Sequence, residues 1–333
     1  MTTTAATAGG APVRPDQAVF ALVIPVFNEQ AALPALLDAL RATLTPAALA
    51  AAGVARLHVL FVDDGSTDAT ARLLAEAIGA GFPGELIRFS RNFGHQAAVT
   101  AGLAHARADV VGVIDADLQD PPAELPAMLA RWRAGADVVY GVRRQRKENL
   151  VKRAGYRLFY GLIRYLTEGL VPADAGDFCV MDRRAVDAIN ALPETLRFVR
   201  GIRAWVGFRQ EPHPYERAAR AAGRPKYGWR ALYKLATDGI ATSSIRPLRI
   251  AQLLSILFFA LSLAIGAGSL VYLLTADGLD ATLAAVLLLT VFCSVSFFLL
   301  FLCLYVLSAY VGRGYIEAKR RPAYVVMERI GGD

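Results

Sequence analysis

The sequence has 333 residues, of which 55% are hydrophobic, and a formal net charge of +7 at neutral pH. This length allows about two domains, and the apolar content is sufficient for a large core. We expect no nucleic-acid partner, because no RNA- or DNA-binding motif accompanies the basic excess. The three cysteines are not arranged at metal-ligand spacing, so neither a disulfide framework nor a zinc site is expected.

The N-terminal residues 1–17 are rich in Thr, Ala and Pro and lack the apolar segment of a signal peptide, so we expect a flexible tail. From residue 18 to about residue 226, short apolar runs alternate with segments typical of helices. This alternation predicts an α/β domain built on a mainly parallel sheet. The expected strands are residues 19–25, 58–62, 85–89, 110–114 and 138–141.

Two acids, Asp115 and Asp117, follow the fourth expected strand, and Gln119 comes two residues after the second acid. Because alternate side chains of a strand share a face, the two acids are expected on one side. Adjacent carboxylates repel each other unless a cation or a proton lies between them. Oxygen ligands suit Mg²⁺ or Mn²⁺, which typically also bind substrate phosphates. The pattern predicts a metal–diphosphate site, although a lone Asp-x-Asp is also common in solvated loops.

Polar residues follow the other expected strands as well. Pro25 ends the first expected strand, and Glu29 follows it. Asp63 and Asp64 follow the second strand, and Arg91 follows the third. Ligands of parallel α/β sheets bind beyond the carboxyl ends of the strands, which is where these residues are expected. The chain contains neither Gly-x-Gly-x-x-Gly nor a Gly-Lys-Ser/Thr phosphate loop, which argues against a dinucleotide dehydrogenase and a P-loop ATPase.

Two later segments, residues 250–276 and 281–312, contain no Asp, Glu, Lys or Arg. Each exceeds the roughly 20 residues that cross a bilayer as a helix. Basic residues flank the pair on both outer sides, so the positive-inside rule places the α/β domain and both termini in the cytoplasm. An apolar stripe at 150–167 fits either the membrane interface or a core. The expected C-terminal segments are a juxtamembrane amphipathic helix at 227–249, two spans at about 250–275 and 281–311, and a cytoplasmic tail at 313–333.

Residues 20 to about 230 resemble the glycosyltransferase family 2 enzymes of GT-A fold. With the two spans, the whole chain is similar to the polyprenyl-phosphate glycosyltransferases, relatives of dolichol-phosphate mannose synthase. The matching segments are Val-Ile-Pro-Val-Phe-Asn-Glu at 23–29, Val-Asp-Asp-Gly-Ser-Thr-Asp at 62–68, Arg-Asn-Phe-Gly-His at 91–95 and Ile-Asp-Ala-Asp-Leu-Gln-Asp-Pro-Pro at 114–122.

The resemblance implies a role for each matched residue. The implied donor-binding residues are Pro25, Glu29, Asp63, Asp64, Arg91 and His95. The implied ligands of Mg²⁺ or Mn²⁺ on the donor diphosphate are Asp115, Asp117 and Gln119. The implied acceptor and phosphate contacts are Arg143, Arg200 and Lys226. The implied catalytic residues are Asp117 and Asp177, of which Asp177 matches a carboxylate near the sugar and the acceptor that the family label calls the catalytic base.

The acceptor implied by the resemblance changes what Asp177 has to do. A phosphate monoester has a second pKa of about 6 and is largely dianionic at neutral pH, so it hardly needs a general base. We therefore expect Asp177 to orient the acceptor or to stabilise positive charge on the sugar. The alternative is a structural role, in which Asp177 caps the helix that follows.

The expected reaction is inverting transfer of one sugar from a nucleotide-sugar to polyprenyl phosphate at the cytoplasmic face of the inner membrane. A UDP-hexose is the favoured donor and GDP-mannose the alternative. A processive polysaccharide synthase is a competing interpretation. Two observations argue against it: the Gln-x-x-Arg-Trp motif is absent, and two helices enclose no polymer channel unless the chain forms a homo-oligomer. The other alternative is a nucleotide-binding membrane scaffold without activity, against which the intact acids speak.

Overall fold

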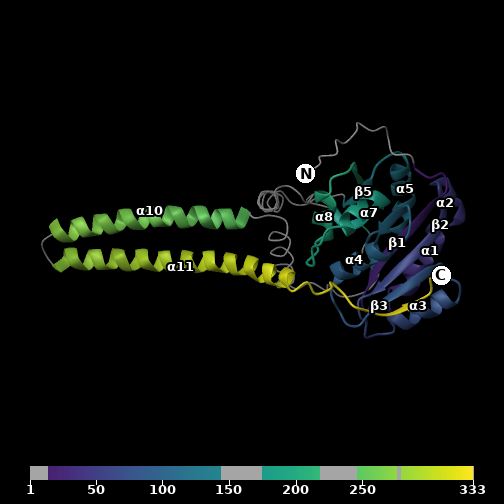
Figure 1. Ribbon diagram of the computed structural model, residues 1–333, viewed down its shortest axis with the longest axis horizontal. Coiled ribbons are helices and arrows are strands. Elements are labelled where there is room, and N and C mark those ends of the chain that lie inside the picture. The colour runs from purple at the N-terminus through teal and green to yellow at the C-terminus, as the bar shows by residue number, and fades with distance from the viewer. Residues whose placement is uncertain (1–13, 144–174, 218–245, 276–278, 333) are drawn as a thin grey trace.

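The computed structural model describes residues 14–143, 175–217, 246–275 and 279–332. They form a globular α/β domain from which a long helical hairpin extends (Figure 1). Lys226, the 150–167 segment and nearly all of the expected 227–249 helix lie outside the described residues.

A mixed sheet in the order β7-β5-β6-β4-β1-β2-β3-β8 runs through the domain. Neighbouring strands are parallel from β4 through β1 and β2 to β3, so these four share one carboxyl edge. The strands are β1 Ala18–Val26, β2 Val54–Asp63, β3 Gly84–Phe89, β4 Val110–Val113, β5 Val138–Arg143, β6 Ala175–Asp182, β7 Gln210–Tyr215 and β8 Val326–Ile330. The mainly parallel α/β sheet is thus confirmed, and β1 to β5 lie where the apolar runs predicted them.

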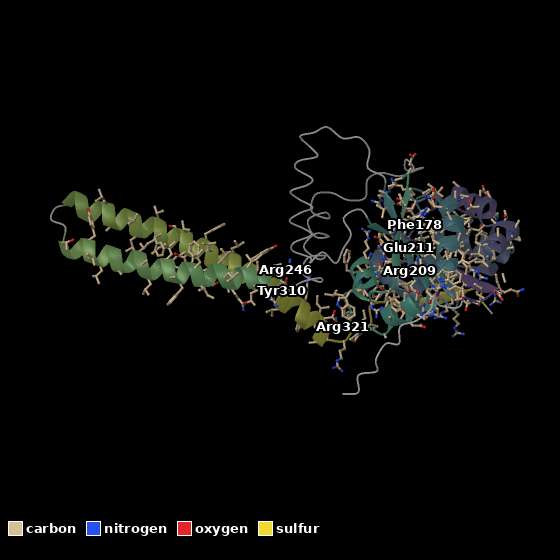
Figure 2. The ribbon with its side chains drawn as sticks, turned by 90° about the horizontal axis from the view of Figure 1, so that it is seen from above. Phe178, Arg209, Glu211, Arg246, Tyr310 and Arg321 are labelled. Carbon is tan, nitrogen blue, oxygen red and sulfur yellow. The ribbon has the colours of Figure 1, made fainter. Side chains whose placement is uncertain are left out.

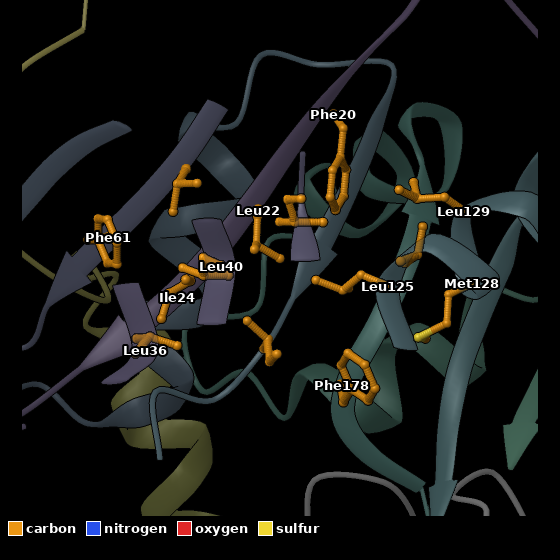
Figure 3. Close-up of a cluster of buried hydrophobic side chains, with 14 of the residues drawn as sticks. Phe20, Leu22, Ile24, Leu36, Leu40, Phe61, Leu125, Met128, Leu129 and Phe178 are labelled. Carbon is orange, nitrogen blue, oxygen red and sulfur yellow. The ribbon is translucent and has the colours of Figure 1, made fainter. Parts of the chain in front are cut away.

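Helices cover both faces of the sheet. Side chains of β1 alternate between the two faces: Phe20, Leu22 and Ile24 pack in one core cluster and Ala21 and Val23 in the other. The first cluster is covered by α1 Leu33–Thr43, α2 Pro46–Ala51, α3 Thr70–Gly79 and α5 Leu125–Arg133, the last preceded by the short 3₁₀ helix η1 Pro122–Glu124 (Figure 3). The second is covered by α4 His95–His105, α7 Arg183–Asn190 and α8 Val199–Trp205.

Close packing brings α4 against the centre of the sheet. A Cβ added at Gly102 would lie 2.1 Å from Cγ1 of Val23, so only glycine lets the helix approach β1 this closely. The N-terminus of α4, with His95, therefore lies directly over the carboxyl end of the sheet.

The N-terminal tail becomes part of the domain earlier than expected. The Arg14 side chain is only 5% exposed; its guanidinium hydrogen-bonds the Ala136 carbonyl at 2.8 Å and pairs with Asp137 and Asp182. It also lies over the Trp132 ring, 5.0 Å from the ring centroid. The two carboxylates compensate the cost of burying the cation, which fixes residues that composition alone assigned to a flexible segment.

The hairpin consists of α10 Arg246–Thr275 and α11 Leu279–Ala318, which pack against each other. Each contains an apolar window long enough to cross a membrane, with no residue of either window buried within the protein. Phe259, for example, is 72% exposed. A soluble core helix would bury such side chains, so these helices indicate membrane association.

The C-terminal tail also differs from the expectation. Instead of ending free in solvent, Val326–Ile330 forms β8 and pairs antiparallel with β3. The Tyr324 ring stacks on Phe89, with centroids 5.0 Å apart and an interplanar angle of 11°. Pairing with β8 covers backbone groups that β3 would otherwise leave unpaired at the sheet edge.

Candidate functional site

The predicted donor-binding residues gather at the carboxyl edge shared by the parallel strands. In the sheet register, Pro25 pairs with Val62, Val26 with Asp63, and Asp63 with Arg88. The three polar loops after β1, β2 and β3 consequently start side by side.

Asp63 and Asp64 hold these loops in shape. Oδ1 of Asp63 accepts the backbone N–H of Ser66 at 2.9 Å, and its Oδ2 lies 3.3 Å from Nε of Arg88. Asp64 accepts the backbone N–H of Phe93 at 2.6 Å, and that of the residue after it at 3.0 Å. Burial raises the pKa of Asp64 despite these bonds. The two acids thus connect the β2 loop to β3 and to the segment that leads into α4.

The β1 loop is joined to the same unit. Asn28 has a φ of 53°, a left-handed conformation that Asn tolerates, and its Oδ1 accepts the backbone N–H of Thr67 at 2.9 Å. The backbone N–H of Glu29 donates to Oγ1 of Thr70 at 2.9 Å. Pro25 is buried within β1. The predicted nucleoside-binding residues therefore belong to one hydrogen-bonded loop cluster.

Asp115 and Asp117 lie just beyond β4, which ends at Val113, so both occupy the loop after the strand and not the strand on which their common face was predicted. Oδ1 of Asp117 accepts the backbone N–H of Gln119 at 3.1 Å, across a turn in which Leu118 has a φ of 57°. Burial raises the pKa of Asp115 to about 6, and nearby carboxylates, including that of Asp117, add to this effect. That the two acids hold one metal ion stays a prediction.

These acids fit a divalent cation that the substrate helps to bind. Oδ1 of Asp115 is buried and accepts no hydrogen bond from the described residues; the nearest cationic atom, Nε2 of His95, is 3.7 Å away. Among the described residues, no group of three or more His, Cys, Asp or Glu side chains could hold a metal ion alone. Mg²⁺ and Mn²⁺ commonly bind one or two carboxylates, with phosphate oxygens and water completing the shell.

Asp177 on β6 is the centre of a second charged cluster. Arg200 on α8 grips it with both ends of its fork, Nε to Oδ1 at 2.8 Å and a terminal nitrogen to Oδ2 at 2.9 Å. Nε2 of His95 lies 3.0 Å from the same Oδ2, and the Gln96 amide donates to it at 3.4 Å. Residues distant in the sequence thus converge on one carboxylate, and His95 connects it to Asp115.

The electrostatics keep Asp177 ionised. Burial alone would raise its pKa, but the charge of Arg200 and the contact with His95 hold that pKa well below its usual range. Burial likewise opposes protonation of His95, yet Asp177 and Asp115 raise the His95 pKa. The helix-capping alternative for Asp177 is wrong, because Asp182 caps α7 by accepting the backbone N–H of Arg184 at 3.1 Å.

The remaining predicted residues are separate from this cluster. Arg143, at the end of β5, interacts with Tyr215, whose hydroxyl donates to the buried Asp120. Burial and Asp120 raise the pKa of Tyr215 to about 12. Arg91 is exposed, with its guanidinium 4.1 Å from the centroid of the Phe93 ring.

Sequence analysis did not assign roles to three contributors to the site. Gln96 bridges Asp177 and α8, Arg88 pairs with Asp63, and Asp120 holds Tyr215. A basic residue directly after the apolar pair Leu86 and Ile87 of β3 was the available signal for Arg88. Gln96 directly follows the matched His95, but its partners come from later parts of the chain and leave no local pattern.

Comparison with known proteins identifies the family. Residues 21–189 match the model of glycosyl transferase family 2. An uncharacterized glycosyltransferase of Bacillus subtilis (strain 168), YkcC, is 37% identical over 316 residues, covering 94% of each chain. The bactoprenol glucosyl transferase of Shigella phage SfV is 35% identical over 314 residues, covering 92% of this chain and 97% of its own. The solved mannosyltransferase PcManGT from Pyrobaculum calidifontis, in complex with GDP-Man and Mn²⁺, aligns over 92% of this chain and 90% of its own, with a TM-score of 0.47 and 18% identity. The chain therefore belongs to glycosyltransferase family 2, as its four motifs predicted.

Proposed function

We propose that this glycosyltransferase moves a single hexose from a nucleotide-sugar to polyprenyl phosphate at the cytoplasmic face of the membrane, with inversion at the anomeric carbon. The observation that carries the proposal is the contact chain from Asp115 through His95 and Asp177 to Arg200. A UDP-hexose is the favoured donor, with GDP-mannose as the alternative. A relative named bactoprenol glucosyl transferase supports both the hexose and the polyprenyl acceptor.

The donor end of the site has to accommodate negative charge. The loop cluster built on Asp63, Asp64 and Asn28 would bind the nucleoside, with Arg91 and His95 toward the diphosphate. Asp115 and Asp117 would hold Mg²⁺ or Mn²⁺, which supplies Lewis-acid neutralisation of the departing diphosphate. In this arrangement the scissile bond would lie beside His95, which is 3.7 Å from Asp115.

The acceptor end has the opposite requirement. A lipid phosphate arrives already deprotonated, and a carboxylate with a depressed pKa, such as Asp177, is a poor proton acceptor. Asp177 instead fixes the directions of Arg200 and His95 and faces the sugar as positive charge develops there. The N–H groups of Arg200 that do not contact Asp177 are suited to grip a phosphate.

The test uses full-length protein in lipid nanodiscs with polyprenyl phosphate and radiolabelled UDP-glucose, UDP-galactose, UDP-N-acetylglucosamine or GDP-mannose, offered one at a time. We expect one donor to label the organic phase as a species of single mobility. EDTA should abolish labelling, and Mg²⁺ or Mn²⁺ should restore it. A labelled polymer would indicate a processive synthase, and no labelled lipid with any donor would contradict the proposal.

Asp117→Asn is the matched variant in the same assay. It keeps the size of the side chain but removes the charge that would bind the cation, so the transfer rate should fall by about 10²-fold or more. Glu76→Ala is the control, because Glu76 forms only an exposed helix pair with Arg72. Equal rates in wild type and Asp117→Asn would remove Asp117 from the metal site.

A further inference from the structure

A side chain at the end of α11 contacts the α/β domain. Glu317 lies next to the last residue of α11, and its carboxylate accepts two backbone N–H groups of the loop before α8. Oε2 accepts the N–H of Thr195 at 2.9 Å, and Oε1 accepts that of Leu196 at 2.8 Å. An acidic side chain at this end of a helix is unfavourable for the helix dipole, so its position is better explained by the loop it binds.

This loop leads directly to Arg200. The loop turns into α8 at Val199, whose backbone N–H donates to Oε1 of Gln96 at 2.8 Å. The Gln96 amide also reaches Asp177, so α8 is held from the sheet side by α4 and from the hairpin side by Glu317. Arg200 therefore lies on a short helix that is held by contacts at two places: Gln96 of α4 binds its first residue, and Glu317 of α11 binds the loop before it.

The position of α8 matters because the hydrogen bonds of the Arg200 guanidinium depend on its orientation. Both of its hydrogen bonds to Asp177 require the guanidinium to lie in the plane of the carboxylate, and the remaining N–H groups point wherever α8 directs them. Displacing a positioning group by about 1 Å can reduce catalysis by about 10²-fold. Without Glu317, the N–H groups of Thr195 and Leu196 would need other partners, and the loop could settle elsewhere.

We propose that Glu317 is a positioning residue for the Arg200–Asp177 pair, so that the seat of α11 sets the geometry of the acceptor end of the site. This inference rests on the proposed transferase function. It connects insertion of the hairpin in the bilayer to the phosphate-binding arginine through one carboxylate and one loop.

A double-mutant cycle in nanodiscs tests the proposal. Glu317→Ala should lower kcat/KM for polyprenyl phosphate by about tenfold with the KM for the nucleotide-sugar little changed, because the loop cluster of the donor end is not touched. Glu317→Gln keeps one acceptor oxygen and should lose only about twofold. In an Arg200→Ala background, Glu317→Ala should cost less than about twofold more, because its effect passes through Arg200.

Several kinetic outcomes would overturn the inference. Losses that multiply in the double variant would show that Glu317 acts independently of Arg200. Unchanged kinetics in Glu317→Ala, or a loss matched by the Glu76→Ala control, would show that the contact has no role in positioning.

Hydrogen exchange separates this inference from the function itself. In Glu317→Ala, deuterium uptake should become faster in peptides covering residues 194–202 and stay unchanged in α3. Faster uptake at Thr195 and Leu196 alone, with α8 unaffected, would overturn the inference. If the wild type transferred no sugar to lipid, the proposed function would fail, while the exchange pattern would still decide whether Glu317 seats α8.

Discussion

At the scale of single residues, the site depends on charges that satisfy one another. Asp177 is buried, yet it stays ionised because Arg200 and His95 surround it. Among the described residues, Asp115 has no ion pair shorter than its 3.7 Å contact with His95, and burial raises its pKa to about 6. The described residues thus compensate the charge of Asp177 more fully than that of Asp115.

Arg200→Ala tests this difference through stability. The variant leaves Asp177 without its fork and should lower the free energy of unfolding at pH 7 by about 2–3 kcal/mol, less than for a fully buried pair because the Arg200 side chain is 29% exposed. A depressed pKa contributes stability above the unfolded value of about 3.9, and that stability is lost as the pH falls through the folded value. The gap in the free energy of unfolding between wild type and variant should therefore be widest near pH 7, and it should become smaller as the pH falls below about 4.

Thermal unfolding in detergent between pH 7 and pH 2 measures the gap. Arg200→Lys keeps the charge without the fork and should fall between the two proteins. A gap that stays constant across this range would mean that the stability of the pair does not depend on ionised Asp177.

At the scale of elements, the parallel strands were predictable and the later strands were not. Strands buried on both faces read as continuous apolar runs, which is why β1 to β4 stand out in the sequence. β7 contains Pro212 and Pro214, which argue against a strand; it tolerates them because it pairs only with β5 at the sheet edge. β8 follows the hairpin, and no local pattern indicates that the chain returns to β3.

The candidate site was likewise predictable only where its residues form a local sequence pattern. The motifs predicted individual acids and arginines near the ends of strands, because each motif is a local pattern. The convergence of His95, Asp177 and Arg200 depends on α4, β6 and α8 packing together, which spacing along the chain does not encode.

Tyr324 carries a prediction about the return of the chain to β3. Tyr324→Ala removes the ring stacked on Phe89 and should lower the free energy of unfolding by about 1–3 kcal/mol. Tyr324→Phe keeps the stack and loses only the hydroxyl, which lies 3.4 Å from Nε2 of His105, so its stability should stay near that of the wild type. Thermal unfolding of the three proteins in the same detergent decides; equal destabilisation by both variants would assign the effect to the hydroxyl.

At the scale of the whole molecule, one end of the helical hairpin faces the α/β domain and the other end points away from it (Figure 1). α10 ends and α11 begins at the end of the hairpin farthest from the domain (Figure 1). Arg246 and Tyr310 lie toward the near end, and Arg321 lies between the hairpin and the domain (Figure 2). With the basic flanks on the domain side, the positive-inside rule favours a cytoplasmic domain and an external turn.

Cysteine accessibility tests this orientation. In a background lacking Cys179, Cys293 and Cys303, we expect Asp280→Cys to react with a membrane-impermeant maleimide in intact cells, because it lies at the start of α11 beside the turn. Arg321→Cys should react only after the cells are permeabilised, since it lies on the domain side of the hairpin. Retained sugar transfer in both variants controls for correct insertion. The reverse labelling pattern would place the domain outside the cell, where it could not meet cytoplasmic nucleotide-sugars, and labelling of both positions in intact cells would mean that the hairpin does not separate two compartments.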